Sequence, residues 1–201
     1  SCQVVLFRCD IKIFNFAVTY INQMKKQDII LLSVILVALV LIRVVFQIPN
    51  FNPLGAIALM GGMLFSSKVL RWVVPIGALL LGDILLGFSN PLNMEYLFST
   101  DFFFVYASFA AIILIGTFFY KNASLTKVLG GSLLAAVAFF LISNAGSWLT
   151  MPEYTKDFAG LITSYELGLP FFRATLVSQI VFSLGIYIVY QLSTKKSIAL
   201  A

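Results

Sequence analysis

Eight side chains could bind a polar solute, because they lie inside or beside strongly apolar runs of the chain. Ionisable residues inside a membrane span are costly and usually face the interior of a helix bundle, where they mark a pathway or a site. Asparagine, tyrosine and tryptophan add hydrogen-bonding groups. We therefore predict a substrate-binding site formed by Arg43, Asn50, Asn52, Asp83, Tyr106, Asn144, Trp148 and Arg173.

Catalysis and metal binding are not expected from this set of residues. The chain contains no histidine, and its two cysteines, Cys2 and Cys9, lie near the N-terminus. Histidine is the most frequent general base and metal ligand in proteins. Asp83 alone offers little for acid–base chemistry. We therefore expect no enzyme, no metal site and no cofactor.

The composition indicates that membrane spans position these residues. Of 201 residues, 61% are hydrophobic and 10% are charged, whereas soluble domains average about 45–50% and about 25%. A spanning helix needs about 20 mostly apolar residues. We therefore predict an all-α integral membrane protein with six transmembrane helices, at residues 29–46, 53–65, 70–88, 102–120, 128–149 and 170–192.

The charged residues orient this predicted bundle, because lysine and arginine prefer cytoplasmic loops. Basic residues lie before the first span, between the second and third, between the fourth and fifth, and after the sixth. The other connectors are mainly acidic, with Lys156 and Arg173 as exceptions. Both termini are therefore expected in the cytoplasm. The short span 53–65 could instead be re-entrant, but five spans would place the basic loops on opposite sides of the membrane.

The candidate site residues fall in the outer half of this bundle. Asp83 lies twelve residues beyond Arg71, or about 18 Å along a helix, whereas the cytoplasmic half of the spans is almost purely apolar. A channel would carry polar residues along its full length. The pattern therefore favours a pocket that opens outward and is closed below.

The charge of this pocket favours an anionic or zwitterionic solute. The spans 53–65, 102–120 and 170–192 begin at the outer face, where each helix N-terminus carries a partial positive charge. Arg43 and Arg173 add two full charges. Asp83 would then pair with an arginine or accept a hydrogen bond from the solute.

Each of these residues also has a purely structural interpretation. The two arginines could snorkel to the lipid headgroups, and Asp83 could form a structural ion pair. Trp148 is typical of an aromatic belt, and Asn144 could form a hydrogen bond between helices. Asn52 followed by Pro53 is typical of a helix N-cap with proline at the first helical position.

Small residues leave a second class of function open. Ala58 with Gly62, and Gly131 with Ala135, form small-xxx-small pairs that let helices approach closely, within the chain or with a partner. The alternative to a solute-binding protein is thus a structural or assembly protein that packs against a partner. An intramembrane enzyme is the less favoured third hypothesis.

Residues 1–23 do not fit the pattern of spans. The segment "MKKQDIILLSVILV", which starts at Met24, is typical of a bacterial start, with a methionine, two lysines and then a span. We expect residues 1–23 to be an N-terminal extension upstream of the native start. Residues 24–201 are then expected to form a single six-helix transmembrane domain.

Five segments in order resemble a bacterial family of uncharacterised membrane transport proteins. They are "PNFNPLGAIALMGG", "PIGALLLGDILLGF", "FVYASFA", "FFLISNAGSWL" and "YELGLPFFRATL". That family in turn resembles the substrate-binding S components of energy-coupling-factor (ECF) vitamin transporters, in size, in helix number and in its outward pocket.

The resemblance implies a protein of the bacterial cytoplasmic (inner) membrane that binds a small vitamin-like solute from outside. S components work with a T subunit and two ATPases, and their connector between helices 1 and 2 often covers the pocket. S components often carry an Ala-xxx-Ala pattern on their first helix, through which the T subunit docks. The predicted span 29–46 departs from this pattern, because its small residues are Ser33 and Ala38. The expected partners are the solute, the lipid bilayer and such an ECF module, and no nucleic acid.

Overall fold

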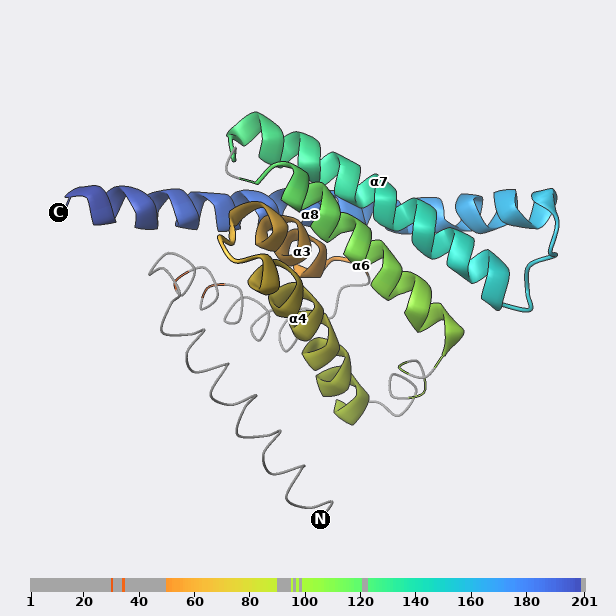
Figure 1. Ribbon diagram of the computed structural model, residues 1–201. Coiled ribbons are helices and arrows are strands. Elements are labelled where there is room, and N and C mark those ends of the chain that lie inside the picture. Colours follow the sequence, from red (N-terminus) through yellow and green to blue (C-terminus); the bar gives the residue numbers. More distant parts are fainter. Residues whose placement is uncertain are drawn as a thin grey trace, which may run out of the picture.

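The computed structural model is helical and contains no strand in the residues that it describes, which are 50–89, 99–120 and 123–199 with single positions at 30, 34, 95 and 97. The helices are α3 (Leu54–Leu64), α4 (Lys68–Ser89), α6 (Thr100–Phe118), α7 (Leu125–Thr150) and α8 (Phe158–Ala199) (Figure 1). Four of them, α4, α6, α7 and α8, are long and apolar enough to cross a membrane. The predicted extension 1–23 and Arg43 lie outside the described residues, as does most of the predicted span 29–46.

The predicted spans match four of these helices within three residues at each end, but the last prediction is wrong at its start. The predicted span 170–192 is part of α8, which begins at Phe158 and passes through Pro170. Proline removes one helical hydrogen bond, yet membrane helices tolerate it where neighbouring groups satisfy the freed carbonyl. Gly168 and Pro170 therefore do not end the helix, although their sequence favours a loop.

Asp157 explains why α8 begins where it does. Its Oδ1 accepts a hydrogen bond from the Gly160 N–H at 2.8 Å and another from the Thr155 hydroxyl at 2.7 Å. These two bonds lower the pKa of this exposed carboxyl below its usual value. An aspartate that binds the third N–H of a helix is a strong N-cap, so the 151–157 connector ends at a defined residue.

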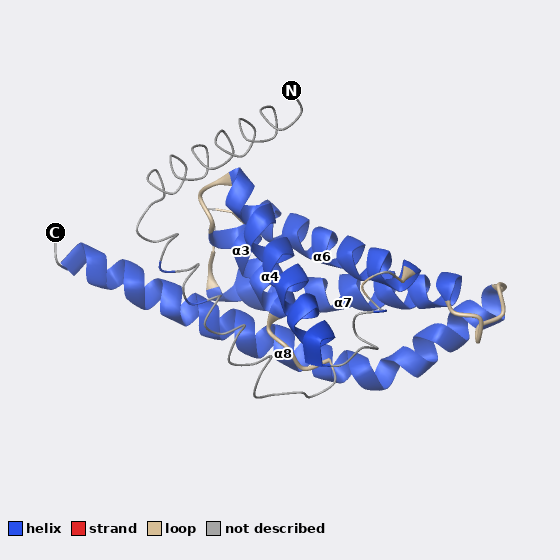
Figure 2. Ribbon diagram, turned by 90° about the horizontal axis from the view of Figure 1, so that it is seen from below, coloured by secondary structure: helices blue, strands red, loops and turns tan. Residues whose placement is uncertain are grey.

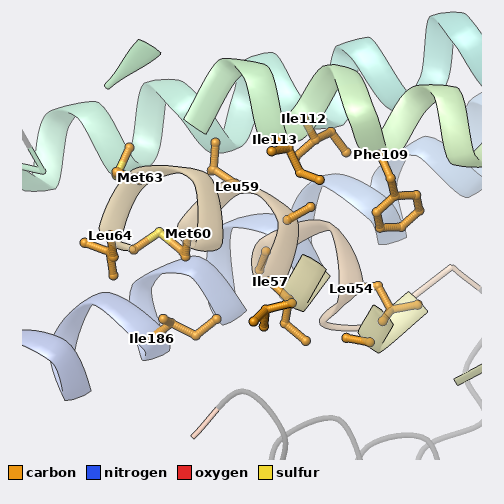
Figure 3. Packing of buried hydrophobic residues seen from close by; sticks show 14 of the residues in the cluster. Leu54, Ile57, Leu59, Met60, Met63, Leu64, Phe109, Ile112, Ile113 and Ile186 are labelled. Atoms are coloured by element: carbon orange, nitrogen blue, oxygen red, sulfur yellow. The ribbon is translucent and has the colours of Figure 1, made fainter. Parts of the chain in front are cut away.

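Helix α3 lies at the centre of the bundle. All of its residues except Gly55 are buried, and it contacts all four of the longer helices. A helix that is apolar on every side is expected to be buried on every side. Figure 3 shows Leu54 at one end of α3 and Met63 with Leu64 at the other, with Phe109, Ile112 and Ile113 of α6 packed alongside.

Glycines let the backbones of α3 and α6 come into direct contact. A Cβ at Gly116 would overlap the Leu59 carbonyl oxygen, and a Cβ at Gly62 would collide with the Ile113 carbonyl oxygen. The predicted small-residue pairs are thus used inside the chain, because Ala58 and Ala135 are also fully buried. Phe109 lines the same cavity as Leu54 at the start of α3, whereas Gly116 meets Leu59 and Gly62 nearer its end, so α3 runs in the same direction as α6.

Arg71 fixes the turn between α3 and α4. It lies inside the predicted span 70–88 and near the start of α4, and its side chain is buried. Its Nε donates to the Phe65 carbonyl oxygen at 2.9 Å, and its guanidinium lies 3.4 Å from the centre of the Tyr120 ring. The cation thereby satisfies a carbonyl that the end of α3 leaves without a helical partner.

The described charged residues of opposite sign lie mainly at opposite ends of the bundle, with Lys156 at the acidic end as an exception. α4, α6, α7 and α8 alternate in direction (Figure 1), so Lys68 and Lys127 lie at one end and Asp101 and Glu153 at the other. α8 has 42 residues, or about 63 Å at 1.5 Å per residue. It therefore continues past the other described helices toward the C-terminus, as Figure 2 also shows.

Candidate functional site

A cavity of about 230 Å³ lies between the N-terminal end of α3 and the four longer helices. Its walls combine apolar side chains with amide and hydroxyl groups and one carboxylate. A small solute could be enclosed there by polar groups that fix its orientation. The lining residues are Asn50, Asn52, Leu54, Gly55, Leu79, Asp83, Val105, Phe109, Ile112, Phe139, Thr175, Ser178 and Gln179.

Gln179 of α8 is, with Ser178, one of the two least exposed hydrogen-bonding side chains of this cavity. Its relative exposure is 3%, and its Nε2 has no hydrogen-bond partner in the part of the chain that the structure describes. The carboxamide lies against the first turn of α3, where a Cβ at Gly55 would overlap the Gln179 Oε1. Gly55 therefore makes the space that this side chain occupies.

Asp83 reaches the cavity from α4, as the sequence predicts. It is half-buried, and the Tyr106 hydroxyl donates to its Oδ2 at 3.3 Å. The Tyr106 ring stacks on Phe102 with 4.0 Å between the ring centres, which orients the hydroxyl. The structure thus brings Asp83 and Tyr106 together, with Asp83 lining the cavity and Tyr106 bound to it.

The connector ahead of α3 supplies Asn50 and Asn52. The Asn52 Oδ1 accepts a hydrogen bond from the Leu54 N–H at 3.1 Å, and Asn52 also lines the cavity. The N-cap residue of α3 is Pro53, however, one position later than the sequence predicts. Asn50 has a backbone φ of 57°, a left-handed conformation in which asparagine is enriched among non-glycine residues. Phe51 between them packs on Phe182 of α8, with ring centres 5.4 Å apart.

A second cavity of about 130 Å³ adjoins the first, because both are lined by Asn50, Phe139 and Thr175. It lies between α7 and α8, nearer the acidic end. Asn144 lines it and donates from Nδ2 to the Phe140 carbonyl oxygen at 2.8 Å. A Cβ at Gly168 would overlap the Asn144 Oδ1, so Gly168 makes room for this amide as Gly55 does for Gln179.

Besides Tyr106, two predicted site residues among those described, Trp148 and Arg173, lie outside both cavities. Trp148 donates from Nε1 to the Thr155 carbonyl oxygen at 2.9 Å, and its own carbonyl oxygen accepts from the Lys156 Nζ at 2.6 Å. It therefore holds the 151–157 connector. Arg173 is exposed and projects from the opposite face of α8 from Thr175 and Gln179.

The predicted positive character of the site is corrected at two helix ends. α8 begins at Phe158 rather than at Pro170, so its N-terminus does not lie beside Arg173. The α6 N-terminus is capped by Ser99, which accepts from the Phe102 N–H at 3.4 Å, and carries Asp101 in its first turn. Of the three predicted helix N-termini, that of α3 lies at the cavity.

The sequence interpretation missed Thr175, Ser178 and Gln179. These residues follow the spacing i, i+3 and i+4 in the segment "RATLVSQIVF", which places them on one face of a helix. A polar stripe on an otherwise apolar span is the signal that could have identified them.

A protein-family model described as "Family of unknown function (DUF6580)" matches residues 22–200 of the chain. No curated protein and no solved structure matches the chain.

Proposed function

The chain belongs to DUF6580, a family of unknown function, and we propose that it is a multi-pass membrane transport protein that binds a small solute in the cavity between α3, α4, α6, α7 and α8. The observation that carries the proposal is a cavity with amide, hydroxyl and carboxylate groups in its wall, inside a bundle whose outer surface is apolar. Polar groups inside such a bundle cost free energy unless they form hydrogen bonds, either with the protein or with a ligand.

The arrangement of the cavity supports binding rather than chemistry. Asp83 is the one ionisable side chain among the described lining residues, and the remaining polar groups are amides and hydroxyls. Such groups orient a ligand through hydrogen bonds, while the phenylalanines exclude water. We therefore propose uptake without a catalytic step.

The direction of α3 supports the proposed six spans. α3 is short, with 11 residues, or about 16 Å. It nevertheless runs alongside α6, and α4, which follows it, runs in the opposite direction. A helix that crosses the membrane from the outer to the cytoplasmic face would have this arrangement. We propose that it serves as the second span, with both termini in the cytoplasm of a bacterial cell and the cavity open to the outside.

An S-component-like mechanism fits this architecture. The connector ahead of α3 borders the cavity through Asn50 and Asn52, as expected for a segment that covers a bound vitamin-like solute. Energy would come from a partner such as a T subunit with two ATPases. The alternative, an assembly protein, is less favoured because Gly62, Gly116 and Ala135 are already packed within the chain.

Mass spectrometry of small molecules that co-purify with the full chain tests the proposal. We expect the wild-type protein to retain a solute and Asp83→Asn to retain about tenfold less, because hydrogen bonds to a charged group are the stronger kind. Glu153→Gln, on the exposed connector, is the matched control and should retain the wild-type amount. A wild-type protein without any retained solute, or equal retention by Asp83→Asn, would contradict the proposal.

A further inference from the structure

Gln179 and the first turn of α3 form a site for one particular kind of chemical group. A buried donor without a partner is rare in folded proteins and needs an explanation. The Gln179 Nε2 is such a donor, in a side chain with 3% relative exposure. Gln179 lines the cavity. Its Nε2 has almost no accessible surface, so a turn of the carboxamide would present this donor to an acceptor atom of a bound solute.

The helix end beside Gln179 favours the same kind of group. Leu54 and Gly55, at the start of α3, line the cavity, and a helix N-terminus attracts negative charge and acceptor oxygens. Figure 3 places Leu54 and Phe109 toward this end of α3. Gly55 holds the Gln179 carboxamide against this turn, because any larger side chain would overlap the Gln179 Oε1.

We propose that the solute presents a hydrogen-bond acceptor, either a carboxylate or an amide carbonyl oxygen, to the Gln179 Nε2 at the N-terminus of α3. This inference rests on the proposed function, because it names the chemistry of the solute that the same cavity binds. Gly55 is then a specificity residue that keeps the carboxamide in place.

The remainder of the solute is flat and apolar. Phe109 and Phe139 line the first cavity with ring centres 5.7 Å apart, and Phe140 and Phe172 line the second at 5.0 Å. Aromatic rings pack best against other rings in offset or edge-to-face arrangements. An aromatic acid or amide therefore satisfies Gln179 and packs against these pairs of phenylalanines.

Three probes that share one ring and differ in their head group test this proposal. Benzoate, benzamide and benzylamine are titrated against the detergent-purified full chain, and binding is measured by saturation-transfer NMR. We expect benzoate or benzamide to bind with a dissociation constant on the order of 1 mM, as is usual for ligands of this size. Benzylamine should bind more weakly, because its ammonium group offers donors and no acceptor.

Variants of Gln179 assign the effect to its Nε2. Gln179→Glu keeps the size of the side chain but removes its N–H donors, so the affinity for the preferred probe should fall about tenfold. Gln179→Met has neither polar atom of the carboxamide, and its affinity for the preferred probe should fall by a similar factor. Gln191→Glu is the matched control on α8, since Gln191 binds the Tyr187 hydroxyl at 2.9 Å outside both cavities, and it should bind like the wild type.

Gly55→Ala provides a variant that keeps the glutamine at position 179 but changes where its carboxamide lies. Its added Cβ displaces the carboxamide, so the preferred probe should bind more weakly while thermal unfolding shows a folded protein. The inference is overturned if benzylamine binds as tightly as the other probes, if no probe binds saturably, or if folded Gln179→Met and Gly55→Ala bind like the wild type. If a solute still co-purifies in such a case, only the role of Gln179 is lost. If none co-purifies, the proposed function itself has failed.

Discussion

At Asn50 the chain enters the wall of both cavities with a left-handed backbone, at φ 57°. Asparagine visits this region more readily than other non-glycine residues, whereas a β-branched residue is a genuine outlier there. The residue thus has two separable contributions. Its backbone conformation sets the direction in which the chain enters α3. Its side chain is available to contact a solute in the cavity.

Two substitutions at Asn50 separate these contributions. Asn50→Val should lower the free energy of unfolding by about 1–2 kcal/mol, because the left-handed conformation costs roughly that much for a residue with a crowded Cβ. Asn50→Gly accepts the conformation and should unfold at nearly the wild-type temperature, while retaining less co-purified solute. Thermal unfolding in detergent and mass spectrometry measure the two effects. Equal unfolding temperatures for both variants would show that the backbone conformation is not required.

At the scale of the helices, close approach at glycine decides how α3 fits into the bundle. Gly116→Ala should lower the unfolding free energy by about 1–3 kcal/mol, because the added methyl group overlaps the Leu59 carbonyl oxygen. Gly130→Ala is the matched control on α7, since a Cβ there meets nothing within 4 Å. It should be neutral or slightly stabilising, because alanine favours the helix. Thermal unfolding of both variants tests the crossing, and a Gly116→Ala protein as stable as Gly130→Ala would contradict it.

The helices were largely predictable from the sequence because continuous apolarity over a span-length run dominates their formation. The start of α8 could not be predicted from the sequence, since glycine and proline, here Gly168 and Pro170, are common loop residues. Gly168 is required by the packing of Asn144 on a distant helix, which no local pattern reveals. The site was predictable where a single residue was conspicuous, as at Asp83. Gln179 was missed, because its burial depends on how α8 meets α3.

At the scale of the whole molecule, the described helices present an apolar outer surface with charges at its two ends. Large apolar side chains are exposed along α4, α6, α7 and α8, with Phe118 at 85% and Phe103 at 67%. Soluble monomers rarely expose contiguous patches of this kind, whereas a lipid-facing surface requires them. The surface therefore favours a bilayer around the bundle, and the separated charges favour one orientation in it.

Cysteine labelling in intact bacterial cells tests this orientation. In a chain with Cys2→Ser and Cys9→Ser, single cysteines are introduced as Glu153→Cys and Thr126→Cys, both at exposed positions on opposite ends of α7. A membrane-impermeant maleimide should label Glu153→Cys in intact cells and Thr126→Cys only after permeabilisation, because the basic end faces the cytoplasm. The reverse pattern would invert the bundle and open the cavity inward, and uptake from outside would then be the wrong direction of transport. Labelling of both positions in intact cells would instead place the two ends of α7 on one side of the membrane, which a spanning helix cannot satisfy.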